Sequence, residues 1–252
     1  MKWHVLAMVV ACNAPEHREQ VSPPVVVVHP ADAAAARDAP TAKPTPSVDA
    51  GLAIVDTPMA WSAERERLTL DYRRTHSDPN AVDLTIAPTV IVLHYTSGNS
   101  AKATRAYFDN PKIEAERATL RHGGLVNVSA HYLVDRDGTV YRLQPETRFA
   151  RHCIGLNHIA IGIENVGDEA EHPLTDAQIA ADAALVRDLA ARFPITRLLG
   201  HYEVMKLRTS PLYVELDRTY KNDKPDPGAR FMAAVRERVA DLHLAGLVLV
   251  GQ

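Results

Sequence analysis

The segment 175–193 most constrains the fold of this chain, because its pattern predicts a long helix set among short strand-like runs. Thr175 and Gln178 form a capping box, apolar residues then recur at helical spacing, and Pro194 ends the helix. Strand-like runs lie at 89–93, 129–134, 139–143, 159–164 and 196–200, and further helices are expected at 63–74, 100–108 and 227–244. This order predicts an α/β fold with a single mixed central β-sheet flanked by helices.

The first residues and the segment after them predict an exported protein on a tether. Residues 1–12 place one lysine before a short apolar run that ends in Cys12, which resembles a bacterial lipoprotein signal with a lipidated cysteine. The alternative is a nonspecific apolar N-terminus with an incidental cysteine. Residues 13–58 are rich in Pro, Ala, Val and Asp, a composition that predicts a disordered linker before a folded domain at 59–252.

Charge and cysteine content exclude several classes of protein. The net charge of −3 gives no general attraction to nucleic acid or to an anionic membrane surface. Two cysteines cannot build a disulfide framework. The chain has 12 histidines, which invites a search for a metal site, although most histidines are ordinary surface or core residues.

Three histidines follow strand-like runs, and their position suggests a metal centre. His94 follows the run 89–93, His152 follows the run 139–143 by a few residues, and His201 follows the run 196–200. Strand ends at one sheet edge converge, so these side chains could meet. A catalytic zinc ion takes three nitrogen or oxygen ligands and keeps one open position, which two histidines and one carboxylate would satisfy. Spacing alone leaves His152 and His201 in competition, and ordinary buried or surface histidines remain the alternative.

Six motifs, in order, resemble one enzyme family. They are VLHYTSG at 92–98, VSAHYLVDRDGTVYRL at 128–143, ARHCIG at 150–155, NHIAIGIENVG at 157–167, LLGHYE at 198–203 and KPDPG at 224–228. This set resembles the type 2 N-acetylmuramoyl-L-alanine amidases, zinc enzymes related to phage T7 lysozyme and to peptidoglycan recognition proteins. The outer-membrane lipoprotein members are closest in layout. The resemblance covers residues 59 to about 240.

The resemblance implies roles for five residues. His94, His201 and Asp226 fall on the positions of the family's ligands to one Zn²⁺ ion. Glu164 falls on the general base, and Lys224 falls on the residue that stabilises the transition state. The resemblance therefore selects His201 over His152 as the second histidine ligand.

Four more residues are expected to contact substrate: His152, Arg151, Tyr95 and Asn157. Arg151 departs from the family pattern, because a tryptophan often stands there, and a cation favours a peptide carboxylate over sugar stacking. The chain also has an insertion at 203–223, expected to form a loop over the cleft, and Ala130 replaces the catalytic tyrosine of the phage type.

The resemblance implies an enzyme with the peptidoglycan amidase fold. It is expected to hydrolyse the amide bond between N-acetylmuramic acid and L-alanine in peptidoglycan or muropeptides, as a monomer. It would act in the periplasm, bound to the outer membrane through a lipid on Cys12, with no nucleic-acid partner. Two alternatives remain: a non-catalytic peptidoglycan-binding module, and a secreted enzyme directed at rival bacteria.

Overall fold

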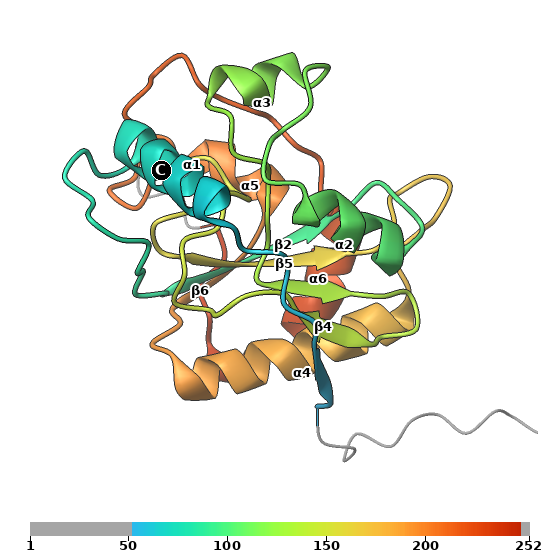
Figure 1. The fold of residues 1–252 in the computed structure, drawn as a ribbon. Helices are drawn as coiled ribbons and strands as arrows, with labels where there is room; N and C mark the ends of the chain where they lie inside the picture. Colours follow the sequence, from blue (N-terminus) through green and yellow to red (C-terminus); the bar gives the residue numbers. More distant parts are fainter. Residues whose placement is uncertain (1–51, 248–252) are drawn as a thin grey trace, which may run out of the picture. The chain divides into compact units, whose positions relative to one another are not determined.

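The computed structural model describes residues 52–247 (Figure 1). The expected signal at 1–12 and most of the expected linker lie outside the described residues. The end of that linker differs from the expectation, because Ile54–Asp56 form strand β1, which pairs in parallel with β4. The folded domain therefore begins a few residues before the expected boundary at 59.

A six-stranded sheet forms the centre of the fold, in the order β1-β4-β3-β5-β2-β6. The other strands are β2 (Val90–Tyr95), β3 (Tyr132–Val134), β4 (Val140–Arg142), β5 (Ala160–Asn165) and β6 (Arg197–Gly200). Strands β3 and β4 form an antiparallel hairpin, whereas β1–β4, β3–β5, β5–β2 and β2–β6 are parallel. Gly138 has a φ of +88° in the hairpin turn, a conformation that favours glycine. The sheet is mixed, which confirms the predicted fold class.

Helix α4 (Asp176–Arg192) begins at its predicted capping box. The helices are α1 (Ala63–His76), α2 (Ala101–Asp109), α3 (Ala118–His122), α4, α5 (His201–Val204) and α6 (Ala229–Arg238), with 3₁₀ turns at Met205–Leu207 and Ala240–Leu242. The side chains of Ser100 and Thr175 accept hydrogen bonds from the first turns of α2 and α4, and Gln178 completes the capping box of α4. The helix expected to reach 244 ends at Arg238 instead, and α3 has no counterpart among the expected helices.

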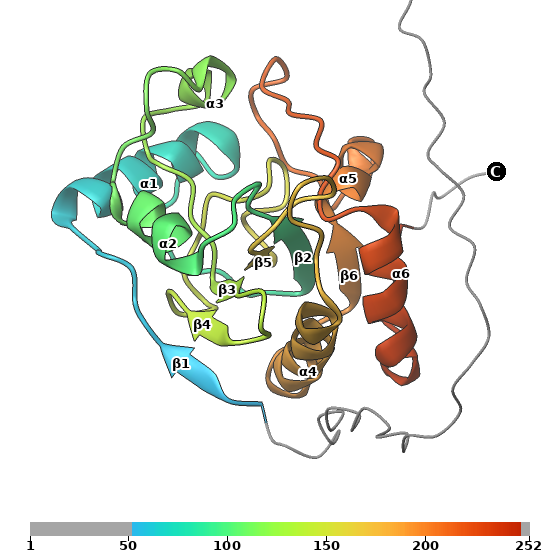
Figure 2. The same cartoon turned by 90° about the vertical axis from the view of Figure 1, so that its right-hand side faces the viewer.

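Both faces of the sheet are covered (Figures 1 and 2). Helices α4 and α6 pack on one face, where Ile91, Leu93, Ile161 and Ile163 join the buried side chains of both helices. On the other face the alternate residues of β2, including Val90 and Val92, pack against the loop after β4 and the segment after α5. Because β2 is buried on both sides, its sequence is a continuous apolar run rather than an alternating one.

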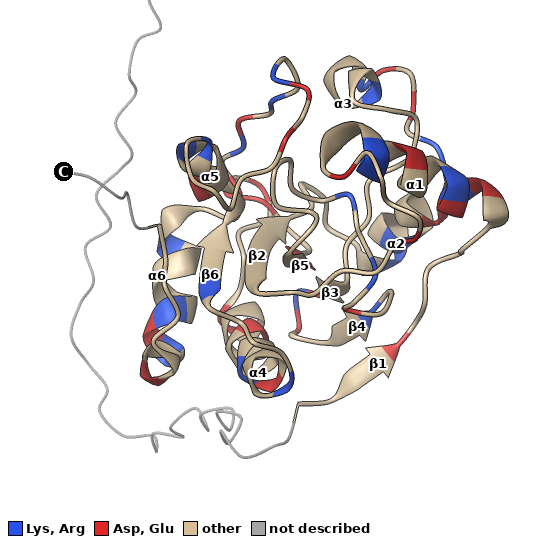
Figure 3. Ribbon diagram, turned by 90° about the vertical axis from the view of Figure 1, so that its left-hand side faces the viewer, with Lys and Arg blue, Asp and Glu red and all other residues tan. Residues whose placement is uncertain are grey.

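The surface of the domain carries both signs of charge. Both acidic and basic residues lie along α1, α4 and α6 (Figure 3), in keeping with the small net charge. Within residues 52–247, every helix is too short or too polar to cross a membrane.

Candidate active site

The carboxyl ends of three adjacent parallel strands place the site. His94 lies near the end of β2, and its register partner on β5 is Glu164. Strand β6 pairs with the other side of β2 and ends at Gly200, the register partner of Leu93, so that His201 opens α5 at the same edge of the sheet. Parallel strands deliver their carboxyl ends to one edge, and here that edge carries the two histidines and the glutamate.

Asp226 reaches this edge from the segment that precedes α6. The backbone carbonyl of Asp226 accepts a hydrogen bond of 2.9 Å from the N–H of Tyr202, which ties the segment to the first turn of α5. Its carboxylate is buried and lies between the two histidines. Chain order alone could not show this contact, because the insertion 203–223 separates His201 from Asp226.

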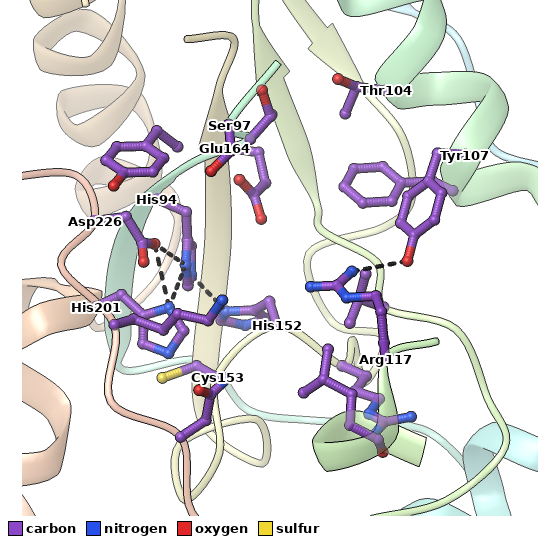
Figure 4. Close-up of a pocket in the computed structure, with 18 of the residues that line it drawn as sticks. His94, Ser97, Thr104, Tyr107, Arg117, His152, Cys153, Glu164, His201 and Asp226 are labelled. Atoms are coloured by element: carbon purple, nitrogen blue, oxygen red, sulfur yellow. Dashed lines mark hydrogen bonds and ion pairs between the residues drawn. The ribbon is translucent and has the colours of Figure 1, made fainter. Parts of the chain in front are cut away.

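Three side chains converge on one point (Figure 4). The Nδ1 atom of His94 lies 3.0 Å from the Nδ1 atom of His201 and 3.1 Å from Oδ2 of Asp226, and the distance from His201 Nδ1 to that oxygen is 3.2 Å. All three are buried, and one ligand atom from each lies within 4.8 Å of the others. Two imidazole nitrogens and one carboxylate oxygen are the donor set of a three-ligand zinc site, so these residues could hold a metal ion.

The electrostatics of the cluster suit a cation. Burial lowers the pKa of His94 to about 4, so its ring is neutral and keeps a lone pair for a metal at neutral pH. Burial raises the pKa of Asp226, but the close contacts of its carboxyl with His201 and His94 outweigh burial and hold that pKa well below its usual range. The centre therefore combines the negative charge of Asp226 with the neutral ring of His94.

Glu164 stands beside this cluster and lines the same cavity. Its side chain is half-buried, and its Oε2 atom has no hydrogen-bond partner among the described residues. Burial, followed by the negative charge of Asp226, raises the pKa of Glu164 to about 8, although Lys224 and Arg117 act in the opposite direction. A carboxyl with a raised pKa in a cavity is a candidate general acid or base.

A cavity of about 510 Å³ joins these groups. Lys224 and Tyr95 line it together with the three clustered residues and Glu164. The wall opposite His94 comes from α2 and the segment that leads to α3, where the hydroxyl of Tyr107 accepts a 2.8 Å hydrogen bond from Arg117 and donates one of 2.9 Å to Glu114 (Figure 4). These three residues were not expected at the site, since no strand end marks them in the sequence.

Arg151 lines the cavity, but its hydrogen-bond donors are used by the protein itself. Its side chain is only 2% exposed, and its guanidinium donates to the backbone carbonyls of Leu120, Gly124 and Val126 and to the hydroxyl of Tyr220. An arginine whose donors serve the protein's own chain does not offer a free fork to a substrate carboxylate. Arg117 also lines the cavity, on the wall opposite His94.

Asn157 and His152 also bond to the protein itself. The side-chain oxygen of Asn157 accepts hydrogen bonds from the backbone N–H groups of His152 and Cys153, at 2.9 and 2.7 Å, and Asn157 is 5% exposed. It therefore shapes the loop rather than facing the cavity, which differs from the expected substrate contact. His152 reaches the cavity wall, but its ring bonds to His94.

The insertion 203–223 packs against the domain along its length. The N–H of Val214 donates to Gly155, the N–H of Leu216 donates to His76, and the buried Glu215 carboxylate lies 2.8 Å from the His76 ring. Its Tyr220 lines the cavity. The insertion therefore forms a fixed wall of the cleft in this structure.

Comparison with known protein families identifies the family of this chain. The family model described as N-acetylmuramoyl-L-alanine amidase matches residues 84–229, more than half of the chain. The chain belongs to this amidase family. The resemblance drawn from the six motifs is thereby confirmed, and the matched range contains all three clustered residues and Glu164.

Individual relatives in this family have low sequence identity to the chain. Peptidoglycan-recognition protein SC2 of Drosophila simulans is 30% identical over 117 residues, which cover 45% of this chain and 62% of that protein. The endolysin of Escherichia phage T7 is 31% identical over 100 residues, covering 38% of this chain and 66% of its own. These matches span less than two thirds of either relative. Among solved structures, the endolysin amidase LysCS of Clostridium intestinale is 22% identical with a TM-score of 0.48, over 75% of this chain and 97% of its own.

Proposed function

We propose that this chain is a zinc-dependent N-acetylmuramoyl-L-alanine amidase that cuts the bond between N-acetylmuramic acid and L-alanine in peptidoglycan or muropeptides. One observation carries the proposal: His94, His201 and Asp226 converge on a point in the same cavity as Glu164, whose Oε2 atom has no hydrogen-bond partner within residues 52–247. Such a donor set with a nearby base is what hydrolysis of an amide requires.

The residues that would hold the metal are His94, His201 and Asp226. A zinc ion bound there would supply a Lewis acid that polarises the amide carbonyl. The carboxylate of Asp226 would balance part of the added charge, and burial of all three side chains excludes competing water from their contacts.

Glu164 would move the proton that the reaction transfers. Water adds to the carbonyl carbon of the lactyl group, and the ionised carboxylate of Glu164, which the positive charge of a bound metal ion would favour, accepts a proton from that water. The C–N bond then breaks and Glu164 passes the proton to the leaving amine of L-alanine, so that the products are a carboxylate and a free stem peptide. A positioned base of this kind contributes about 10²–10⁴ to the rate.

Lys224 would stabilise the charge that develops on the carbonyl oxygen. It lines the same cavity, and its ammonium lowers the pKa of Glu164 after the larger effects of burial and of Asp226. A cation in place before the reaction stabilises the transition state more than the ground state, because the oxygen is neutral in the substrate.

A second candidate is a peptidoglycan-binding module without catalysis. Similarity to peptidoglycan-recognition proteins favours it. The substitution Glu164→Gln separates the two, because it keeps size and removes the base. We expect muropeptide binding to persist and hydrolysis to fall about 10²–10⁴-fold. Glu237→Gln, at an exposed position of α6 outside the cavity, is the matched control and should retain activity. Wild-type protein that binds muropeptides without cleaving them would establish the binding module.

Export is a separate part of the proposal. The lipoprotein-like segment at 1–12 supports a periplasmic enzyme held at the outer membrane by a lipid on Cys12. Mass spectrometry of the native N-terminus tests this: an acylated Cys12 is expected, and an unmodified Met1 would contradict it.

A further inference from the structure

His152 lies on the far side of His94 from the clustered ligand atoms (Figure 4). The Nε2 atom of His94 lies 3.0 Å from the Nδ1 atom of His152, and the Nε2 atom of His152 lies 3.2 Å from the carbonyl oxygen of Ala160. The two rings meet edge to face, at an interplanar angle of 88°. The three groups form a chain of hydrogen bonds that runs from the metal centre into the backbone of β5.

The carbonyl group at the end of this series of hydrogen bonds determines which nitrogen of each histidine ring carries a hydrogen. The carbonyl of Ala160 can only accept, so Nε2 of His152 carries a hydrogen. A histidine that binds metal through Nδ1 is neutral and carries its hydrogen on Nε2. Nδ1 of His152 must then accept the hydrogen bond from His94. The arrangement thus selects the tautomer of His94 that directs its Nδ1 lone pair toward His201 and Asp226.

The surroundings hold His152 in this orientation. Its backbone N–H bonds to the side chain of Asn157 at 2.9 Å. Its ring lies against Gly162 on β5, where an added Cβ would stand 2.6 Å from the ring's Cγ atom. Glycine at 162 therefore leaves the space that the ring occupies, and any side chain there would displace it.

We propose that His152 is a positioning residue for the metal centre: it accepts the hydrogen bond from Nε2 of His94 and so orients that ring, rather than binding substrate. The inference rests on the proposed zinc site. Outer partners of metal-binding histidines fix their tautomer and orientation, and their loss weakens metal affinity about 10–100-fold.

Two substitutions of the full chain test the hydrogen bond itself. His152→Asn places an amide oxygen near the position of Nδ1, so that it can still accept from His94. His152→Gln places its amide near the position of Nε2, so that it can bond to Ala160 but not to His94. The readout is the zinc dissociation constant, measured by competition with a chromophoric chelator, with the absorption spectrum of the Co²⁺-loaded protein as a second readout. His122→Gln is the control, because the His122 side chain is 64% exposed.

We expect His152→Gln to weaken zinc binding about 10–100-fold and to change the Co²⁺ spectrum, while His152→Asn and the control stay within a few-fold of wild type. Gly162→Ala, which displaces the ring, should behave like His152→Gln. Circular dichroism of each metal-free variant confirms that it folds. Equal losses in the Asn and Gln variants would show that packing alone matters, and unchanged affinity in the Gln variant would show that the bond does not matter; either result overturns the proposal. If the wild-type protein binds no zinc, the proposed function fails together with this proposal. If the wild-type protein binds zinc and only the variants depart from expectation, this proposal alone fails.

Discussion

The Oδ2 atom of Asp226 lies 3.1 Å from the Nδ1 atom of His94, although 132 positions separate the two residues. His94 is delivered by the central strand β2, whereas Asp226 arrives from the segment after the insertion. The backbone hydrogen bond between Asp226 and Tyr202 spans the whole insertion and closes the cluster. The proposed metal centre therefore depends on a contact between segments that lie far apart in the sequence.

Asp226→Asn tests that contact directly. The substitution keeps the size of the side chain and removes its charge, so it should weaken zinc binding by more than the ~10–100-fold expected for an outer partner, and abolish measurable hydrolysis. Zinc content after dialysis and muropeptide hydrolysis are the measurements. Asp223→Asn is the matched control, since Asp223 is exposed in the same segment. Wild-type zinc content in the Asp226 variant would remove this residue from the metal site.

Arg151→Ala should destabilise the fold rather than weaken substrate binding. The guanidinium bonds to three backbone carbonyls and to Tyr220, so its loss leaves buried acceptors without partners and should lower the free energy of unfolding by about 3–5 kcal/mol. Arg151→Lys should recover little of this, because an ammonium cannot reproduce the planar fork. Urea unfolding gives the free energy. An unchanged unfolding curve together with a raised KM would restore the substrate role.

Glu215→Ala should loosen the insertion. The carboxylate and the His76 ring are both nearly inaccessible, and His76 also bonds to the carbonyl of Gly123. Removal of one partner from a buried pair costs about 3–5 kcal/mol. Hydrogen exchange at 205–223 should become faster in this variant and stay unchanged in Glu237→Ala, an exposed control. Equal exchange in both variants would show that other contacts hold the insertion.

Glu164 should make the stability of the metal-free protein depend on pH. Burial raises the pKa of this carboxyl from 4.5 to about 8, so between these values the folded state holds a proton that the unfolded state has released. Its contribution to the stability is therefore present below pH 4.5 and is lost as the pH rises through 8. Glu164→Gln stays neutral throughout. It should match wild type near pH 4.5 and exceed it by about 1–3 kcal/mol above pH 8, in urea unfolding with chelator present. A difference that is constant with pH would contradict this assignment.

The sheet and the clustered residues could be predicted because they depend on local signals. Capping residues mark the starts of α2 and α4, a continuous apolar run marks β2, and a histidine at a strand end lies at a predictable edge of the sheet. The choice of His201 over His152 needed the family motifs, since both follow strands. The structure then brings His201 to Asp226 and places His152 behind His94.

The roles of Arg151, Asn157 and Arg117 could not be predicted, because they depend on the direction of loop side chains. Arg151 turns toward α3 and Tyr220, where several carbonyls converge, and only the folded chain places those carbonyls together. Arg117 enters the cleft because the segment from α2 to α3 forms the opposite wall. Short segments such as β1 and α3 were missed because three to five residues carry too little periodicity.

Digestion of a muropeptide of defined structure tests the central claim most directly. The purified protein is incubated with the substrate untreated, after treatment with a chelator, and after zinc is restored, and the products are identified by mass spectrometry. The account predicts a free peptide that begins with L-alanine and a sugar that keeps its lactyl carboxylate in the first and third samples, and intact substrate in the second. Intact substrate in all three samples, or cleavage at a different bond, would contradict it.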